Sequence, residues 1–316
     1  MRLKLYAKLQ QDLNCSRTSI DNFCRTAPNK YKVYTIPKRT SGVRVIAHPS
    51  RPLKLFQRSL LKILGPIKGV HQASYAYRKG TSIRDNALKH SHSRYMLKMD
   101  FKDFFNSLIP DMLYVAMCEH GVVLSNAEKR TLTRLLFWNK TKSFNEKLVL
   151  SVGAPSSPLV SNIIMYKFDK ALSEKCLSSK ITYTRYADDL TFSTNQKGIL
   201  FEVPSIVRNL LGEIFQHRIS LNESKTIFTS KAHNRHVTGV TINNEGQLSI
   251  GRERKRMISA MVHKYKNDGL SEVDSSYLAG LISFALHIEP TFIERLKVKY
   301  GERVLYNISR GTSNGN

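Results

Sequence analysis

The sequence predicts an α+β fold in which antiparallel strands pack against helices. Segments with apolar residues three and four positions apart alternate with short segments rich in β-branched and aromatic residues. Short turn sequences separate several of the strand-like segments, which favours hairpins. The chain has 316 residues, of which 41% are hydrophobic, enough for two or three subdomains.

The first hundred residues are expected to contain helices, one hairpin and one strand. Residues 1–30 have a weakly amphipathic helical pattern, with Ser16 and Thr18 as candidate N-caps. Strand residues on both sides of Thr40-Ser41-Gly42 predict a hairpin over Tyr31–Pro49. The next expected elements are a basic helix, a short helix and an apolar strand that ends on Asp100, at Arg51–Leu64, Ser82–His90 and Arg94–Met99.

The rest of the chain alternates in the same way. Helices are expected from Asp100 to about Trp138, and a loop at Val149–Pro158 then leads into a helix that Ser157 caps and Pro158 begins. The later elements are strands at Ile181–Tyr186 and Leu190–Ser193, an amphipathic segment at Phe201–Phe215, a hairpin at Val237–Gly251 that turns at residues 243–246, and a basic, mainly helical region at residues 252–316 with a loose tail.

Three aspartates are the best candidates for chemistry. Asp188 and Asp189 stand at the expected tip of the 181–193 hairpin, where aspartates usually satisfy the turn backbone. Asp100 ends a strand beside several aromatic residues. There an ionised carboxylate is costly unless it is paired or metal-bound, although it could also cap the next segment. Converging carboxylates suit hard divalent cations, and two such cations can catalyse in-line phosphoryl or nucleotidyl transfer.

The charge of the chain indicates a polyanionic partner. Lys and Arg number 50 against 24 Asp and Glu, a formal net charge of +26. Residues 1–99 hold 21 of the basic residues and only three acids, so 21 − 3 = +18 of that charge lies in this region. A basic tail on a membrane is the alternative, but apolar residues interrupt the region and predict a folded segment. Charge and carboxylates together favour a metal-dependent enzyme that acts on nucleic acid.

Other features limit the function classes. The sequence has no apolar run of membrane-spanning length and no signal-peptide core at Met1-Arg2-Leu3, so we expect no membrane association. The four cysteines lack metal-type spacing and are expected to be reduced thiols in a cytoplasmic protein; they are Cys15, Cys24, Cys118 and Cys176. His233-Asn234-Arg235-His236 is expected to be a solvated or RNA-facing basic loop and not a metal site.

Seven short motifs follow one another between about Tyr31 and Tyr300. They are Lys38–Ile46 with Leu53-Lys54 and Gln57, Tyr77–Ile83, Met99–Phe105, Gly153–Pro158, Tyr186-Ala187-Asp188-Asp189, Leu221–Thr226 and Val240–Gly251. In this order they resemble the reverse transcriptase family, from its two fingers motifs through the palm motifs and the aspartate box to the primer grip. Asn86–His90 and Val237-Thr238-Gly239 are similar to features of bacterial retron enzymes.

The resemblance implies a right-hand polymerase with fingers, a palm of antiparallel strands that carries the catalytic carboxylates, and a small, mainly helical basic thumb. An N-terminal helical segment would cover residues 1–30 and the fingers residues 31–94. The palm would cover residues 95–251, with helical insertions at 106–148 and a primer-grip hairpin at 237–251. The thumb and the C-terminal tail would cover residues 252–316.

The resemblance also implies roles at the catalytic centre. Asp100 and Asp188 would bind two Mg²⁺ ions, and Asp189 would be a secondary or orienting ligand, because neighbouring strand side chains point to opposite sides. The candidates for contact with the incoming nucleotide are Arg44 at the triphosphate, Lys38 and Arg78 as weaker candidates, Phe105 against the 2′ position of the sugar, Lys225 as proton donor to pyrophosphate, and backbone groups at Gly153 and Ala154.

Each of these roles has a plainer alternative. Arg44 could contact the nucleic acid backbone in a general way, Phe105 could be a core residue and Lys225 could be solvated. Val152 departs from the family pattern, because many relatives carry glutamine there. The contact of that glutamine with the incoming sugar is therefore not expected here.

RNA contacts are implied for the retron-like segments and for the start of the thumb. The candidate residues are Asn86, His90, Val237, Thr238, Gly239, Arg252, Arg254, Lys255 and Arg256. A helix over residues 252–266 would turn Met257, Ile258, Met261 and Val262 inward and its cations toward an RNA stem.

The resemblance implies a Mg²⁺-dependent RNA-directed DNA polymerase that binds one dedicated non-coding RNA and deoxynucleoside triphosphates. Synthesis would start from an internal guanosine 2′-hydroxyl and leave a branched RNA–DNA with a single-stranded DNA product. A separate effector protein and a role in anti-phage defence are also implied. The alternatives are a free-standing intron-like or diversity-generating reverse transcriptase, and a non-catalytic RNA-binding scaffold.

Overall fold

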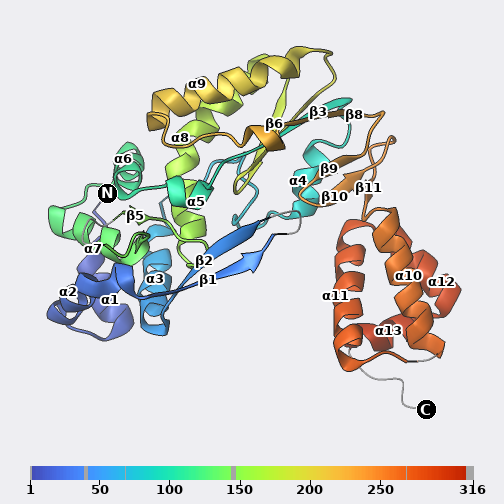
Figure 1. The fold of residues 1–316 in the computed structure, drawn as a ribbon, viewed down its shortest axis with the longest axis horizontal. Coiled ribbons are helices and arrows are strands. Elements are labelled where there is room, and N and C mark those ends of the chain that lie inside the picture. Colours follow the sequence, from blue (N-terminus) through green and yellow to red (C-terminus); the bar gives the residue numbers. More distant parts are fainter. Residues whose placement is uncertain (1, 39–41, 68, 144–146, 268, 311–316) are drawn as a thin grey trace. The chain divides into compact units, whose positions relative to one another are not determined.

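A computed structural model describes residues 2–38, 42–67, 69–143, 147–267 and 269–310 (Figure 1). Helices and antiparallel strands alternate along the chain, which confirms the predicted α+β class. The chain divides into two compact units. The first comprises Met1–Gly80, Lys98–Leu190 and Gly198–Ile227, and the second comprises Thr81–Leu97, Thr191–Lys197 and Phe228–Asn316. The division into fingers, palm and thumb stays a prediction.

The first unit begins with helices and a two-stranded ribbon. These elements are α1 (Leu5–Leu13), α2 (Arg17–Thr26), the 3₁₀ helix η1 (Ala27–Asn29), β1 (Tyr31–Pro37), β2 (Val43–Pro49) and α3 (Arg51–Leu64). Ser16 is the N-cap of α2, since its hydroxyl accepts a hydrogen bond from Ser19 N at 3.1 Å; Thr18 lies inside the helix. β1 and β2 pair antiparallel along their whole length. Of the expected turn, Thr40 and Ser41 lie outside the described residues.

The helix α3 has the predicted bounds, and its sequence explains them. Pro52 fits the first turn, where its missing N–H group is not needed. Leu53, Leu60 and Leu64 form an apolar stripe that is fully buried. Gln57 lies on the same buried side and donates a hydrogen bond to Leu135 O at 2.9 Å, so its burial does not leave the amide nitrogen unpaired.

Helices make up most of the middle of the first unit. Its elements there are α5 (Phe104–Ser107), α6 (Pro110–Glu119), α7 (Asn126–Leu136), β4 (Trp138–Asn139), β5 (Leu148–Val149), α8 (Ser157–Ser178), η2 (Ile199–Glu202), α9 (Val203–Phe215) and η3 (Glu223–Lys225). The predicted cap of α8 is wrong by one residue: Ser156 precedes the helix in a helical backbone conformation and makes no side-chain cap. α8 packs against α6 and α9.

A four-stranded sheet has the strand order β6-β7-β3-β8. Its strands are β3 (Tyr95–Asp100), β6 (Thr182–Tyr186), β7 (Asp189–Thr194) and β8 (Ile227–Ser230). β6 and β7 form the predicted hairpin, but Asp189 already belongs to β7, so Ala187 and Asp188 alone make the tip. Because β3 lies next to β7, this order brings the end of β3 to the hairpin tip.

The second unit joins a short helix and a small sheet to a helical bundle. Its elements are α4 (Ile83–Lys89), β9 (Arg235–Val237), β10 (Val240–Ile242), β11 (Leu248–Ser249), α10 (Arg252–Asn267), α11 (Glu272–Ile288), α12 (Pro290–Tyr300) and α13 (Glu302–Arg310). One core of apolar side chains runs through it, from Ala87 and Val237 to Ile258, Ile282 and Leu305.

Three expectations for the second unit need correction. The predicted 237–251 hairpin is a three-stranded sheet, because β9 adds a strand before it. Arg235 is fully buried and not part of a solvated loop, since its guanidinium donates to Ser93 O and Asn243 O. Of the four residues predicted to face inward from α10, Met257 is exposed, whereas Ile258 and Val262 are buried and Met261 packs against the same core; Tyr265 is buried as well. None of the helices in the described part of the chain is long and apolar enough to cross a membrane.

Candidate active site

The tip of the β6–β7 hairpin brings two of the predicted aspartates together. Phe101 N donates to Asp188 O at 3.1 Å, so the residue after Asp100 is tied to the tip. Asn222 N donates to Asp100 O at 2.8 Å and fixes the other side of the strand end. Ala187 has a positive φ of 57°, which costs about 1–2 kcal/mol outside glycine. The chain therefore accepts strain at the residue immediately before Asp188.

Asp100 already has a cationic partner. Lys225 Nζ lies 2.8 Å from Asp100 Oδ2, and the Asp100 side chain is only 8% exposed. Burial opposes the charge on Lys225, but the hydrogen bond to Asp100 and the nearby aspartates outweigh it and raise the pKa of Lys225. The predicted role of Lys225 as a proton donor fits a protonated amine at this place. The ion pair itself was not expected from the sequence.

The other two carboxylates are electrostatically unfavourable as they stand. Loss of hydration raises the pKa of Asp188, and the negative charge of Asp100 raises it further. The same two causes, with Asp188 as an additional negative neighbour, raise the pKa of Asp189 to about 6, although its side chain is exposed. Carboxylates held together at such a cost are suited to a cation that neutralises them.

The donor set fits a divalent metal that also uses substrate oxygens. Among the described residues, no three His, Cys, Asp or Glu side chains gather closely enough to form a metal centre by themselves. Mg²⁺ commonly takes only one or two protein carboxylates together with water and substrate phosphates. Asp100 and Asp188 provide such a pair, and the Lys225 ammonium shows that a positive charge is stable beside Asp100.

Asp189→Asn is expected to raise the melting temperature of the metal-free protein by about 2–4 °C near pH ~7.5, which corresponds to about 1 kcal/mol after solvent screening. The folded pKa of about 6 lies above the unfolded value, so the wild-type carboxylate destabilises the fold when it is ionised. The difference between the two proteins should therefore shrink as the pH falls through 6 towards ~4. Thermal unfolding across this pH range measures it, and a difference independent of pH would contradict the raised pKa.

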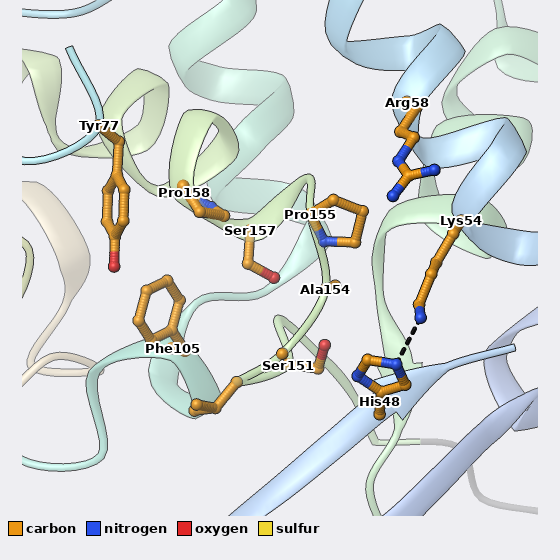
Figure 2. A pocket seen from close by; sticks show the side chains of 12 residues that line it. His48, Lys54, Arg58, Tyr77, Phe105, Ser151, Ala154, Pro155, Ser157 and Pro158 are labelled. Atoms are coloured by element: carbon orange, nitrogen blue, oxygen red, sulfur yellow. Dashed lines mark hydrogen bonds between the residues drawn. The ribbon is translucent and has the colours of Figure 1, made fainter. Parts of the chain in front are cut away.

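A cavity of about 370 Å³ lies in the first unit, and its wall contains several of the predicted residues (Figure 2). It is lined by His48, Lys54, Arg58, Tyr77, Phe105, Ser151, Val152, Gly153, Ala154, Pro155, Ser157 and Pro158. Figure 2 shows the rings of Tyr77 and Phe105 together at one end and the three basic side chains at the other. Lys54 Nζ donates a hydrogen bond to His48 Nε2 there. One end thus suits an apolar or aromatic group and the other an anion.

The loop before α8 forms the floor of the cavity by close contact with β2. Ala47 N donates to Val152 O at 3.0 Å. Gly153 has a φ of 118°, and a Cβ there would lie 3.1 Å from Ile46 Cγ2 and 3.3 Å from Ala47 O. The glycine of the predicted loop–helix motif is therefore required by backbone conformation and by space. Val152 contributes its side chain to the wall and its carbonyl to this contact.

The three basic residues predicted to contact the nucleotide from the fingers region have different surroundings. Arg44 is exposed on β2, opposite Ile36, and its positive charge helps to lower the pKa of Asp188 against the larger raising effects. Lys38 is exposed at the end of the ribbon. Arg78 donates to Gln72 O at 2.7 Å and lies over the Tyr75 ring, so its own loop holds it. Among the described residues, the cavity wall includes none of these three.

Sequence reasoning missed several residues of the cavity. Tyr77 was only part of a fingers motif, yet its ring faces Phe105 (Figure 2). A positive φ of 61° at Tyr77 was not readable from the sequence, because tyrosine rarely adopts it. His48 and Arg58 were not singled out either. The helical spacing of Lys54 and Arg58, one turn apart on a basic helix, was the available signal.

The retron-like segments meet within the second unit. Thr238 and Gly239, both at positive φ, make the two-residue turn between β9 and β10. Arg254 donates from α10 to Gly239 O at 2.9 Å. α4 packs against β10. Val237-Thr238-Gly239 therefore has a structural task, and a contact with RNA stays a prediction.

The predicted RNA-contact residues on and directly after α4 lie inside the protein. Asn86 and His90 are buried, so the predicted direct RNA contacts do not agree with their positions. Burial lowers the pKa of His90 to about 3 and keeps the ring neutral, with Ser193 Oγ at 2.8 Å from Nδ1. Neither polar atom of the Asn86 side-chain amide has a hydrogen-bond partner among the residues that the structure describes. Val237 is buried as well, which leaves Thr238 and Gly239 as the accessible part of this motif.

The four residues of α10 that were predicted to contact RNA form two groups. Arg252 and Arg256 are exposed and available for an anionic partner. Lys255 forms an ion pair with Glu289 at 2.6 Å, and Arg254 is bound to the Gly239 carbonyl and lies over the Phe284 ring. The second pair therefore stabilises the unit, so its substitution would affect folding as well as any contact with RNA.

Known proteins resemble this chain in sequence and in fold. The family model described as "Reverse transcriptase (RNA-dependent DNA polymerase)" matches residues 36–242. Retron Ec83 reverse transcriptase of Escherichia coli is 49% identical over 285 residues, which cover 90% of this chain and 91% of the relative. Retron Ec73 reverse transcriptase of the same organism is 30% identical over 286 residues, which cover 88% and 89%.

A solved structure supports the fold alone. Apo telomerase from Candida tropicalis matches with a TM-score of 0.52 at 13% identity. The match covers 90% of this chain and 62% of that one. At this identity the likeness extends to the chain path and not to substrate or partner.

Proposed function

Because this chain belongs to the reverse transcriptase family, and within it to the retron enzymes, we propose that it copies one dedicated structured RNA into DNA from a primer that the same RNA provides. The predictions of a right-hand polymerase fold and of an RNA-directed DNA polymerase are confirmed by these relatives. The priming group of the proposal is the 2′-hydroxyl of an internal guanosine. The product is then a single-stranded DNA joined to RNA by a branch.

The observation that supports catalysis is the position of Asp100 and Asp188. Both lie where β3 ends beside the β6–β7 tip, and Lys225 lies 2.8 Å from Asp100. A relic site would have no reason to keep carboxylates with raised pKa values in a chain of net charge +26, because they weaken the binding of RNA. An intact catalytic function explains why they are present.

Different residues of the site would have different roles in nucleotidyl transfer. Asp100 and Asp188 would hold two Mg²⁺ ions, which would stabilise the charge that develops on the attacking and leaving oxygens. Arg44 binds the triphosphate, because a guanidinium forks onto phosphate oxygens. The primer hydroxyl gives its proton to water and attacks the α-phosphorus, the bond from that phosphorus to the oxygen bridging to the β-phosphate breaks, and pyrophosphate leaves. The raised pKa of Lys225 keeps a proton available for that leaving group.

The second unit offers a surface for the RNA stem. Arg252 and Arg256 are exposed on α10, while Ile258, Val262 and Tyr265 bury the opposite face of the helix. A helix of this kind binds an RNA duplex through its phosphates and its shape and does not recognise the base sequence. The proposal adds a separate effector protein and a role in defence against phage, both of which were expected from the resemblance of the sequence to retron enzymes.

Sequencing of the nucleic acid that co-purifies with the protein tests this proposal. Wild-type protein from its native host should carry one RNA species together with DNA complementary to part of it, and RNase treatment should leave the DNA. Asp188→Asn protein is the matched control, since it should carry the same RNA without the DNA. A mixture of unrelated RNAs would contradict a dedicated template, and the same RNA without DNA on both proteins would indicate a scaffold.

A further inference from the structure

Arg185 is a fully buried arginine whose guanidinium is hydrogen-bonded to the tip of the β6–β7 hairpin. It precedes the tip by two residues and is 0% exposed. Nε donates to Asp169 Oδ1 at 2.8 Å and Nη2 to Asp169 Oδ2 at 2.6 Å, a bidentate pair. Nη1 donates to Ala187 O at 3.0 Å. The same guanidinium therefore joins the interior of α8 to the strained residue before Asp188.

The network continues from Arg185 to the wall of the cavity. Arg185 Nη2 also donates to Asn162 Oδ1 at 3.1 Å, and Asn162 Nδ2 donates to Ala76 O at 3.0 Å. Ser74 Oγ donates to the same Asn162 oxygen at 2.9 Å. Ala76 precedes Tyr77, whose ring faces Phe105 in the cavity (Figure 2). Asn162 thus links the Asp188 turn to the loop that presents Tyr77.

Backbone bonds support the same link. Tyr75 N donates to Arg185 O at 2.8 Å, and Arg185 N donates to Ala73 O at 2.8 Å. Residues 73–75 are therefore paired directly with the strand that leads into the tip. The metal carboxylate and the aromatic wall belong to segments more than a hundred positions apart, yet both are fixed to one buried group.

Stability alone does not explain this arrangement. Burying an ion pair costs several kcal/mol per charge, and replacing such a pair by apolar residues of similar volume is often neutral or stabilising. A positive φ at Ala187 adds a further cost of about 1–2 kcal/mol. The hydrogen bond to Ala187 O compensates for that strain only if the guanidinium is held in place, which its bidentate pair with Asp169 does.

We propose that Arg185 is a positioning residue for catalysis: it fixes the Ala187 carbonyl and thereby the direction of the Asp188 side chain. Asn162, which is hydrogen-bonded to the same guanidinium, fixes the loop that carries Tyr77. Lysine cannot replace Arg185, because one ammonium lacks the planar fork that reaches Asp169, Asn162 and the carbonyl together. The inference rests on the polymerase activity of the family and is independent of how synthesis is primed.

The test uses the full-length protein on an RNA template with a pre-annealed DNA primer. Arg185→Met combined with Asp169→Leu removes both charges, so melting temperature should stay close to that of the wild type. The turnover number should fall about tenfold to a hundredfold, because Asp188 is no longer held in the productive direction. The Mg²⁺ concentration that gives half-maximal activity should rise about tenfold, and RNA affinity should not change.

Two single variants separate positioning from a structural role. Asn162→Ala should raise the KM for deoxynucleotide more than it lowers the turnover number, because it loosens the Tyr77 loop and leaves the Arg185–Ala187 bond in place. Tyr183→Phe is the matched control: it removes a 2.9 Å hydrogen bond to Asp169 and should leave the Mg²⁺ dependence unchanged.

The proposal is overturned if the folded double variant keeps wild-type turnover and Mg²⁺ dependence. It is overturned equally if activity falls only in proportion to the folded fraction. If the double variant does not fold, Arg185→Lys tests the same role, because it keeps the positive charge beside Asp169 and loses the hydrogen bond to Ala187 O. Wild-type Mg²⁺ dependence in a folded Arg185→Lys protein would reject the role. If the wild-type protein itself synthesises no DNA in this assay, the result instead rejects the assignment of polymerase activity.

Discussion

Asp188→Asn is expected to lower DNA synthesis by roughly a thousandfold or more and to leave RNA binding intact. The substitution keeps the size of the side chain and removes one charge from the pair that Asp100 and Asp188 form. Several kcal/mol of transition-state stabilisation depend on the cations that this pair would hold, and such an energy corresponds to about three powers of ten in rate. Single-turnover primer extension with Mg²⁺ measures the effect.

The fold should survive this substitution, because the pKa of Asp188 is already raised and a neutral side chain is better tolerated there. RNA affinity and melting temperature are the controls. A folded Asp188→Asn protein that extends a primer at nearly the wild-type rate would place the catalytic carboxylates elsewhere. Asp189→Asn is the useful comparison, since its smaller predicted role should give a smaller loss.

Phe105→Ala is expected to reduce discrimination against ribonucleotides by roughly five- to a hundredfold. Phe105 is half-buried and lines the cavity opposite Tyr77 (Figure 2). A sugar with a 2′-hydroxyl would meet this ring, and an overpacking clash of about 1–3 kcal/mol corresponds to that range. The ratio of kcat/KM for a deoxynucleotide to that for the matching ribonucleotide gives the discrimination directly.

Phe105→Tyr retains the ring and is the matched control for sugar choice. The neighbouring Phe104 is buried and stacks on Phe101, so it is a core residue and not a suitable control for sugar choice. If a stable, active Phe105→Ala protein discriminates as strongly as the wild type, Phe105 is a packing residue. The Tyr77 ring, which lies next to Phe105 at the same end of the cavity, would then be the next candidate for the filter (Figure 2).

Local sequence patterns predicted most of the elements, because the signals were strong and short-range. The apolar stripe and Pro52 gave α3 its bounds, and β-branched residues around two turn residues gave the β6–β7 hairpin. Ser156 and Ser157 are both good caps by type, so the start of α8 was misplaced by one residue. A cap is chosen by backbone conformation, which adjacent identical residues do not reveal.

Burial of polar residues could not be predicted in the same way. Arg235 belongs to a segment of histidines and asparagine that looks solvated, and only tertiary contacts with the Ser93 and Asn243 carbonyls allow its burial. His90 is similar, since its neutral state depends on the surrounding core and on Ser193. Partners of this kind lie on other elements, and sequence spacing does not report them.

In the candidate site, too, some residues could be predicted from the sequence and others only from tertiary contacts. The three aspartates were found because their chemistry and spacing are unusual, whereas Arg185 appeared only as a strand residue. Its importance lies in bonds to Asp169 and Asn162, which are on a helix earlier in the chain. The ion pair of Lys225 with Asp100 likewise joins residues 125 positions apart. A motif indicates candidate reacting groups, and the structure shows which residues hold them.

The most direct test of the proposed function is the chemical nature of the DNA 5′ end in the cellular product. DNA that co-purifies with the wild-type protein is treated with RNase, and one half is then treated with an enzyme that cleaves 2′–5′ bonds. The account predicts a ribonucleotide on the 5′ end that RNase leaves in place and that the debranching step removes to expose a free 5′ phosphate. A free 5′ phosphate before debranching, or no attached ribonucleotide after RNase, would contradict priming from a 2′-hydroxyl.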